Sequence, residues 1–219
     1  MKKITITLIL LLVATFGAMA QNENDNVANE VTKKKKPLFS SIAVGIDLLG
    51  PGMRYFGDQG DYQATLQAGI RGMFLPVVEL GYGTSDKKDD LLATAYKSKG
   101  TFGRIGCDYN VLKDKLDDYR LTVGIRYGIS HFDYDTTLPT DSLHKEFTTT
   151  SESCTLHWLE LAFGVDVKVW GPMHMGWSVR YRRRLKVSDY INDPRYAPGF
   201  GNATESSAFM ALYSIGLQF

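Results

Sequence analysis

The chain has 219 residues, which suits one domain of ordinary size, and its 25 Lys and Arg nearly balance its 24 Asp and Glu. A net charge of +1 lacks the basic excess of nucleic-acid-binding proteins, so we expect no nucleic-acid partner. After the first twenty residues, no run approaches the roughly eighteen apolar residues of a membrane helix. A membrane location would therefore require β-strands.

Residues 1–20 have the three parts of a secretory signal peptide. Lys2 and Lys3 give a charged start, an apolar run follows, and the sequence AMA ending at Ala20 has the form of a cleavage site. We expect cleavage between Ala20 and Gln21. Cleavage removes two Lys and no acid, so 25 − 2 = 23 basic residues face 24 acidic ones, a net charge of −1. No Cys follows the cleavage site directly, which argues against a lipid anchor.

Residues 21–37 are predicted to form a flexible, Lys-rich tail. The segment is polar, lacks periodicity and contains four consecutive Lys, from Lys33 to Lys36. Two interpretations of this charge remain open. The tail is either simply solvated, or it is attracted to anionic lipid headgroups or to an acidic partner.

From Phe39 to Phe219 the dominant signal is an alternation of apolar and polar residues with period two, which predicts β-strands. No segment shows a convincing helical period. Eight segments show the alternation: residues 41–48, 62–72, 74–83, 101–111, 119–130, 159–169, 175–185 and 211–219.

The predicted connections alternate in length. Short ones lie at residues 72–73, 112–117 and 171–172, and long polar ones at 50–61, 84–94, 133–153 and 187–206. Short periplasmic turns and long external loops are typical of an outer-membrane barrel. We therefore predict that residues 38–219 form an all-β, eight-stranded antiparallel up-and-down transmembrane barrel with both termini in the periplasm.

Glycine indicates which face of the strands points inward. Each strand has at least one Gly on its polar face, where it would weaken a strand exposed to water. Inside a narrow eight-stranded barrel, Gly makes room for larger side chains. A soluble barrel with an apolar interior is the alternative. Aromatic residues near both ends of the apolar face favour a membrane: Phe74, Tyr109, Tyr119, Trp177 and Phe219 at one end, and Tyr62, Tyr82 and Tyr181 at the other.

Charged residues occupy the predicted inward face. Buried charges must be paired, so we expect an ion-pair network that fills the lumen and leaves no open channel. The predicted members are Glu79, Arg104, Asp108, Arg126, Glu160, Asp166, Lys168, Arg180 and Arg182.

The alternating strands, the loop asymmetry and the terminal Phe resemble the small outer-membrane barrels of the OmpA-transmembrane and OmpX type. The chain is also similar to uncharacterised small outer-membrane proteins of Gram-negative bacteria. In such barrels the last strand ends on an aromatic residue and is read as a signal by the barrel-assembly machinery. The residues that match this pattern are Tyr213, Ile215, Leu217 and Phe219.

The sequence thus favours an integral outer-membrane barrel with a structural or interaction role, in contact with membrane lipid and lipopolysaccharide, that is neither an enzyme nor an open pore. One alternative is an accessory subunit of a larger outer-membrane assembly, which would give it a protein partner. A second is a lipid A or phospholipid-modifying enzyme that uses Ser130, His131 and His157. No catalytic motif, cofactor site or metal-ligand spacing is present, and Cys107 and Cys154 are predicted to be free thiols.

Overall fold

The computed structural model describes residues 39–89, 94–112, 118–141 and 146–219. The predicted signal peptide, its cleavage site at Ala20 and Gln21, and the tail with Lys33 to Lys36 lie outside the described residues. Within the described part of the chain, no helix is long and apolar enough to cross a membrane.

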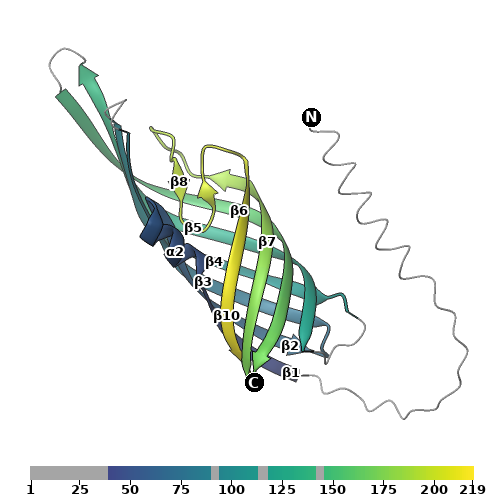
Figure 1. Ribbon diagram of the computed structural model, residues 1–219. Helices are drawn as coiled ribbons and strands as arrows, with labels where there is room; N and C mark the ends of the chain where they lie inside the picture. The colour runs from purple at the N-terminus through teal and green to yellow at the C-terminus, as the bar shows by residue number, and fades with distance from the viewer. Residues whose placement is uncertain (1–38, 90–93, 113–117, 142–145) are drawn as a thin grey trace, which may run out of the picture. The chain divides into compact units, whose positions relative to one another are not determined.

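Eight antiparallel strands form a closed barrel in the order β1-β10-β7-β6-β5-β4-β3-β2 (Figure 1). This confirms the predicted all-β, eight-stranded fold. The strands of the barrel are β1 (Phe39–Asp47), β2 (Gln59–Ile70), β3 (Phe74–Asp89), β4 (Thr94–Asn110), β5 (Tyr119–Asp141), β6 (Glu146–Trp170), β7 (Met173–Val187) and β10 (Ser207–Gln218). The other elements are helix α2 (Leu49–Phe56) and a two-stranded sheet of β8 (Tyr196–Ala197) and β9 (Gly201–Asn202).

The barrel closes where β1 pairs with β10. Val44 lies opposite Leu217 and Ile46 lies opposite Ile215. Just beyond β10, Phe219 exchanges two backbone hydrogen bonds with Ile42, at 2.8 and 2.9 Å. The terminal aromatic residue is therefore part of the strand pairing that closes the barrel.

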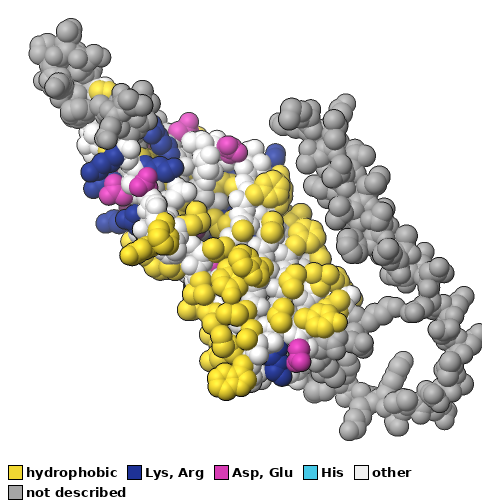
Figure 2. Space-filling model, in the orientation of Figure 1, with side chains coloured by type: hydrophobic (Ala, Val, Ile, Leu, Met, Phe, Trp, Pro, Cys, Tyr) yellow, Lys and Arg dark blue, Asp and Glu magenta, His cyan; other side chains and the backbone are white. Residues whose placement is uncertain are grey.

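Successive residues on a strand face opposite sides of the wall. Glu79 and Arg104 are 1% and 2% exposed, whereas their neighbours Leu80 and Ile105 are 65% and 62% exposed. Hydrophobic side chains cover much of the outer surface of the barrel (Figure 2). An apolar exterior around buried charged side chains is the arrangement of a membrane barrel, not of a soluble one.

Inward-facing glycines make room for the charged side chains, as the sequence indicated. A Cβ at Gly106 would lie 2.6 Å from the Cγ of Arg126, its partner across the strand pair. A Cβ at Gly124 would collide with the carboxylate of Asp108. The wall is therefore kept thin where the largest charged groups cross the lumen.

The two ends of the barrel differ, and we name them by their connections. The turn end carries the short connections at residues 71–73 and 171–172, and the loop end is opposite. At the loop end, β5 and β6 pair as far as Asp141 and Glu146, so most of the predicted loop 133–153 is a β-hairpin. β3 and β4 likewise pair as far as Asp89 and Thr94, in place of the predicted loop 84–94.

Figure 1 shows these strands projecting beyond the rest of the barrel at the loop end. We name the paired strand ends, residues 84–89, 94–99, 133–141 and 146–153, the β3–β6 extension. The sequence did not indicate it because polar residues predominate in these segments, apart from a few apolar ones such as the buried Tyr96 and Tyr134, so the apolar alternation fades. Residues with high β-propensity, such as Thr148, Thr149 and Thr150, still continue the strand there.

Helix α2 contradicts the expectation that no segment is helical. All but its first residue lies in the predicted loop 50–61, and its Pro51 stands in the first turn, where Pro is tolerated. The Asp47 carboxylate accepts a hydrogen bond from the N–H of Gly50 at 2.7 Å. Eight residues that include two Gly and a Pro are too few to show a helical period in the sequence.

Candidate functional site

The lumen holds the most unusual chemistry of the molecule, a cluster of buried charges halfway along the barrel. Seven of the nine predicted network residues meet there, and we name them the central cluster: Glu79 on β3, Arg104 and Asp108 on β4, Arg126 on β5, Glu160 on β6, and Arg180 and Arg182 on β7. All seven are at most 5% exposed.

Glu79 and Glu160 are the hubs of the central cluster. Arg180 donates to both oxygens of Glu79 at 2.7 and 2.8 Å, and Arg104 donates to Oε2 of Glu79 at 2.8 Å. Glu160 accepts from Arg180 at 2.9 Å and from Arg182 at 2.8 Å. The hydrogen bonds cross the lumen from β3 to β7, so the side chains bridge opposite walls of the barrel.

Arg126 and Asp108 form the part of the cluster nearest the turn end. Arg126 Nη2 donates to Asp108 Oδ2 at 2.8 Å, and its Nε lies 3.4 Å from Glu79 Oε1. Gln67 also donates to Asp108, at 3.2 Å. Charge-assisted hydrogen bonds of this kind fix side chains in one geometry, so the network makes a rigid partition across the lumen.

The central cluster contains four arginines but only three carboxylates, and backbone carbonyls meet part of the surplus. Arg104 Nη2 donates to the carbonyl of Gly199 at 2.7 Å, and Arg182 Nη1 donates to the carbonyl of Phe200 at 3.2 Å. Arg184 donates to the carbonyl of Ala203. All three acceptors belong to the connection between β7 and β10, which therefore reaches into the barrel.

We name residues 194–203 the lid. The Ala197 carbonyl accepts from the Phe200 N–H at 3.0 Å, with Pro198 and Gly199 between them. The φ of Gly199 is 75°, as expected for Gly at the third position of a type II turn that has Pro at the second. This turn presents the lid carbonyls to the arginines below.

Asp61 at the start of β2 holds the lid from the side. Its Oδ1 accepts from the hydroxyl of Tyr196 at 2.6 Å, and both of its oxygens accept from the N–H of Gly199 at 3.2 Å. Burial and the adjacent Asp61 carboxylate both raise the pKa of the Tyr196 hydroxyl, which therefore stays protonated and remains a donor. Tyr96 on β4 adds a hydrogen bond to the carbonyl of Tyr196 at 2.9 Å.

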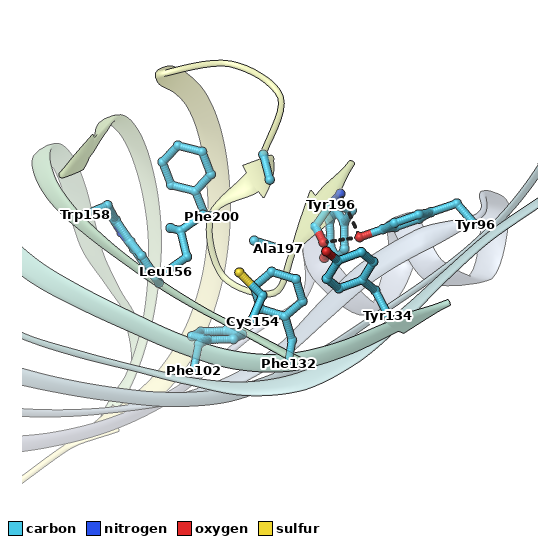
Figure 3. Packing of buried hydrophobic residues seen from close by; sticks show 11 residues of the cluster. Tyr96, Phe102, Phe132, Tyr134, Cys154, Leu156, Trp158, Tyr196, Ala197 and Phe200 are labelled. Carbon is cyan, nitrogen blue, oxygen red and sulfur yellow. Dashed lines mark hydrogen bonds between the residues drawn. The ribbon is translucent and has the colours of Figure 1, made fainter. Parts of the chain in front are cut away.

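The lid packs on an apolar cluster that fills the loop-end half of the lumen (Figure 3). Trp158 and Phe200 are both fully buried, and their ring centroids are 5.9 Å apart. Arg104 of the central cluster also contacts the apolar cluster, since its guanidinium carbon lies 4.6 Å from the centroid of the Phe102 ring. This cluster, which we name the apolar plug, consists of Tyr96, Phe102, Phe132, Tyr134, Cys154, Leu156, Trp158, Tyr196, Ala197, Phe200 and Ala203.

The sequence did not predict this apolar plug, although a signal was present. On each strand, the aromatic residue is an even number of positions away from a charged residue of the central cluster and so faces inward as well. This holds for Phe102, Phe132 and Trp158. Extending that parity past Arg104 and Glu160 towards the loops would have revealed a change from charged to aromatic residues.

The turn-end half of the lumen contains a cavity of about 130 Å³, enough for several water molecules. Polar side chains line it, among them Gln67, Thr122, Ser178 and Ser214. The cavity reaches from the central cluster to Asp166 and His174 near the turn end.

Asp166 and Lys168 lie apart from the central cluster, although the sequence placed them in one network with it. Asp166 Oδ1 accepts from Arg120 at 2.7 Å and from His174 Nδ1 at 2.8 Å. Lys168 lies 3.5 Å from the exposed Asp118. Positions 160 and 166 are six residues apart along β6, about 20 Å at the usual rise, which is too far for a direct contact.

The residues suggested for lipid chemistry do not meet. Ser130 is buried on the inward face and donates to the carbonyl of Thr101. His131 and His157 lie on the outward face, where they contact Thr155 and Tyr127 respectively. Cys107 and Cys154 are free thiols, as predicted. Among the described residues no three His, Cys, Asp or Glu are placed to hold a metal ion.

The barrel is similar to solved outer-membrane proteins. A major outer membrane protein from Thermus thermophilus matches with a TM-score of 0.52 and 12% identity over 82% of this chain and 98% of that one. Acinetobacter baumannii CarO2 matches with a TM-score of 0.43 and 12% identity over 83% and 98% of the two chains. Yersinia pestis Ail matches with a TM-score of 0.44 and 10% identity, again over 83% and 98%.

At such low identity, the likeness to the Thermus protein shows the fold alone. No curated protein gave a significant match to the sequence. The model of a family described as a domain of unknown function, DUF6048, matches residues 1–218. The chain therefore belongs to the DUF6048 family, and the structure gives this member a closed eight-stranded barrel with a charged, lidded lumen.

Proposed function

We propose that the protein is an integral outer-membrane barrel with a structural or interaction role, and that it is neither an open pore nor an enzyme. The observation that carries this proposal is the lumen, which is closed twice, by the central cluster and by the lid with its apolar plug. A solute would have to break buried ion pairs and displace packed aromatic rings to pass. The apolar exterior supports placement in a membrane.

We propose further that the turn end faces the periplasm, so that both termini are periplasmic and the loop end is outside. The short turns and the long loop-end hairpins support this orientation, because outer-membrane barrels have short periplasmic turns. The partners that follow are membrane lipid around the belt, lipopolysaccharide at the loop end, and the barrel-assembly machinery during biogenesis.

The interaction role is assigned to the β3–β6 extension. It holds polar side chains on paired strands that project from the barrel, as in the hydroxyl pair of Thr137 and Thr149 at 2.9 Å. Recognition residues commonly lie on projecting segments of a rigid scaffold. The same surface would serve an accessory subunit, which is the second candidate. Isolation of the native protein in mild detergent with a stoichiometric partner would favour that second role.

Cell fractionation and gel mobility test the membrane proposal. We expect the protein in the outer-membrane fraction, and we expect the folded barrel to migrate differently from the boiled protein. Recovery from the soluble periplasm, with no change on boiling, would overturn the proposal.

The terminal strand supplies a separate test of the proposed assembly signal formed by Tyr213, Ile215, Leu217 and Phe219. Leu217 and Phe219 are 47% and 74% exposed on the outer surface, where assembly factors could reach them. A charge at the membrane interface costs only about 0–1 kcal/mol, so Phe219→Asp should refold nearly normally in detergent. We expect the same variant to lose most of its assembled barrel in cells. Normal assembly in cells would remove the signal role.

A further inference from the structure

Helix α2 exposes two aromatic rings that no part of the described chain covers. Tyr55 and Phe56 are 84% and 88% exposed, and their ring centroids lie 5.0 Å apart in an edge-to-face arrangement. Met53 on the same helix is 49% exposed. A soluble surface rarely keeps adjacent large apolar side chains so fully exposed, so we expect a lipid or a protein to contact the two rings.

The helix is fixed to the barrel wall, so the rings are held in one direction. Gly50 is buried, and a Cβ there would collide with the carbonyl of Asp61 on β2. A Cβ at Gly60 would lie 2.6 Å from the Cβ of Arg54. The two glycines thus let the backbones of α2 and β2 touch directly.

Asp47 fastens the start of α2 to the neighbouring strand as well. Its carboxylate accepts from the N–H of Gly50 at 2.7 Å and from the N–H of Tyr213 on β10 at 3.2 Å. The Leu48 N–H also donates to the Tyr213 carbonyl, at 2.8 Å. The pairing of β1 with β10 stops at Asp47 and Ser214, so α2 stands beside the wall where β1 ends.

The exposed rings continue the lipid-facing surface towards the loop end. Figure 2 shows hydrophobic side chains at the position of α2, next to the apolar belt of the strands, with charged side chains of both signs gathered farther towards the loop end. Tyr62 on β2, which is 47% exposed, belongs to the loop-end aromatic belt close to the helix. An apolar band bordered by aromatic and then by charged side chains matches the depth profile of a membrane interface.

We propose that α2 is an interfacial anchor that inserts Tyr55 and Phe56 into the lipid beside the barrel, at the boundary between headgroups and acyl chains on the loop side. Helices at such an interface bury their apolar face about 5–10 Å into this boundary. Arg54 is placed to keep its charge in the headgroup layer, since its guanidinium donates to the exposed carbonyl of Gly57 at 3.4 Å. The inference rests on the proposed membrane location.

Depth-dependent quenching of tryptophan fluorescence tests the anchor. Three full-length proteins carry Trp170→Phe and are reconstituted in phosphatidylcholine vesicles whose acyl chains are brominated near the carbonyl end or near the methyl end. The first of these proteins keeps Trp177, which belongs to the aromatic belt nearer the turn end. The other two also carry Trp177→Phe, with either Phe56→Trp or Ile191→Trp added. The W170F/W177F protein supplies the background of the buried Trp158.

Ile191 is the matched control, because it is apolar and 86% exposed but lies in the connection that precedes the lid. We expect Trp177 and the Trp at 56 to be quenched several-fold more than the Trp at 191, with the Trp at 56 more sensitive to bromine near the carbonyl end. Tyr55→Trp should behave in the same way and replaces the variant at 56 if that protein does not refold.

The outcomes separate the anchor from the membrane location. If Trp177 is quenched and the Trp at 56 is no more quenched than the Trp at 191, the anchor is overturned and the barrel remains in lipid. If Trp177 is not quenched either, the membrane location itself fails. Protection of the Trp at 56 by a bound protein, in place of lipid, would also overturn the anchor.

Discussion

The two halves of the lumen are lined by the inward faces of the same strands, yet the side chains that fill them are of opposite kinds. Towards the loop end, β4 and β6 contribute Phe102 and Trp158, which pack against the lid. Towards the turn end, the same faces contribute Asp108 and Asp166, which border a cavity of about 130 Å³. The loop-end half is apolar and packed, and the turn-end half is polar with room for water.

The difference shows how a narrow barrel can carry buried charge. The central cluster lies between the two halves, and its arginines outnumber its carboxylates. The carbonyls of Gly199 and Phe200 accept from Arg104 and Arg182, so the lid helps to satisfy the buried cations as well as covering the barrel. The central cluster depends on the lid for part of its hydrogen bonding. The lid therefore both closes the lumen and stabilises the buried charges.

The largest effect should come from breaking the central cluster. Glu79→Gln removes the carboxylate shared by Arg104 and Arg180, and loss of one partner of a buried ion pair costs about 3–5 kcal/mol. We expect the free energy of unfolding, measured by urea titration in detergent micelles, to fall by about that amount. The control is Asp118→Asn, which breaks the exposed pair with Lys168 and should cost at most about 1 kcal/mol. Equal losses in both variants would show that the cluster is not a buried network.

A medium effect should follow from overfilling the packed half. A Cβ at Gly128 would collide with the indole of Trp158, and overpacking a core costs about 1–3 kcal/mol. Gly128→Ala should lower the unfolding free energy by that amount. Gly52→Ala is the matched control, because nothing lies within 4 Å of an added Cβ there. If Gly128→Ala is as harmless as the control, the loop-end half is not tightly packed.

The smallest effect is a pH dependence of the hydrogen bonds that attach the connection before the lid to β6. In these bonds Glu152 on β6 accepts from Ile191 and Asn192. The N–H of Ile191, at 2.8 Å, lowers the pKa of the Glu152 carboxyl, and the N–H and side-chain amide of Asn192 act in the same direction. The charged form is therefore favoured in the folded protein. Its contribution is present above the ordinary pKa of Glu and is lost as the pH falls through the lowered value.

We expect the amide shifts of Ile191 and Asn192, followed by NMR in micelles, to titrate below the ordinary pKa of Glu. In Glu152→Gln this titration should disappear. A midpoint at or above the ordinary value in the unaltered protein would mean that Glu152 does not hold the connection.

The sequence predicted the barrel because a membrane wall imposes a strict period-two pattern, as in the run from Tyr119 to Ser130. It also predicted which faces point inward and seven members of the central cluster. It failed where that constraint ends. The β3–β6 extension has polar residues on both faces, and α2 is too short to show a period. The lid owes its position to Asp61, Tyr96, Arg104 and Arg182, whose contacts with it span 95 or more positions in sequence for the first three.

The residues of the lid did contain a partial signal. The Pro198–Gly199 pair predicts a turn, and the apolar Tyr196, Ala197 and Phe200 around it are unusual for a solvated loop. No local rule indicates that this turn folds back into the lumen. That follows only from the arginine donors and the aromatic rings inside the barrel, which come from four other strands.

Conductance across a planar lipid bilayer tests the double closure of the lumen most directly. The full-length protein should give little or no current. A variant in which a Gly-Ser linker replaces residues 196–203 should still show no steady large pore, because Glu79 and Glu160 continue to bridge the lumen with Arg104, Arg180 and Arg182. A steady large-pore current from the unaltered protein would contradict the account.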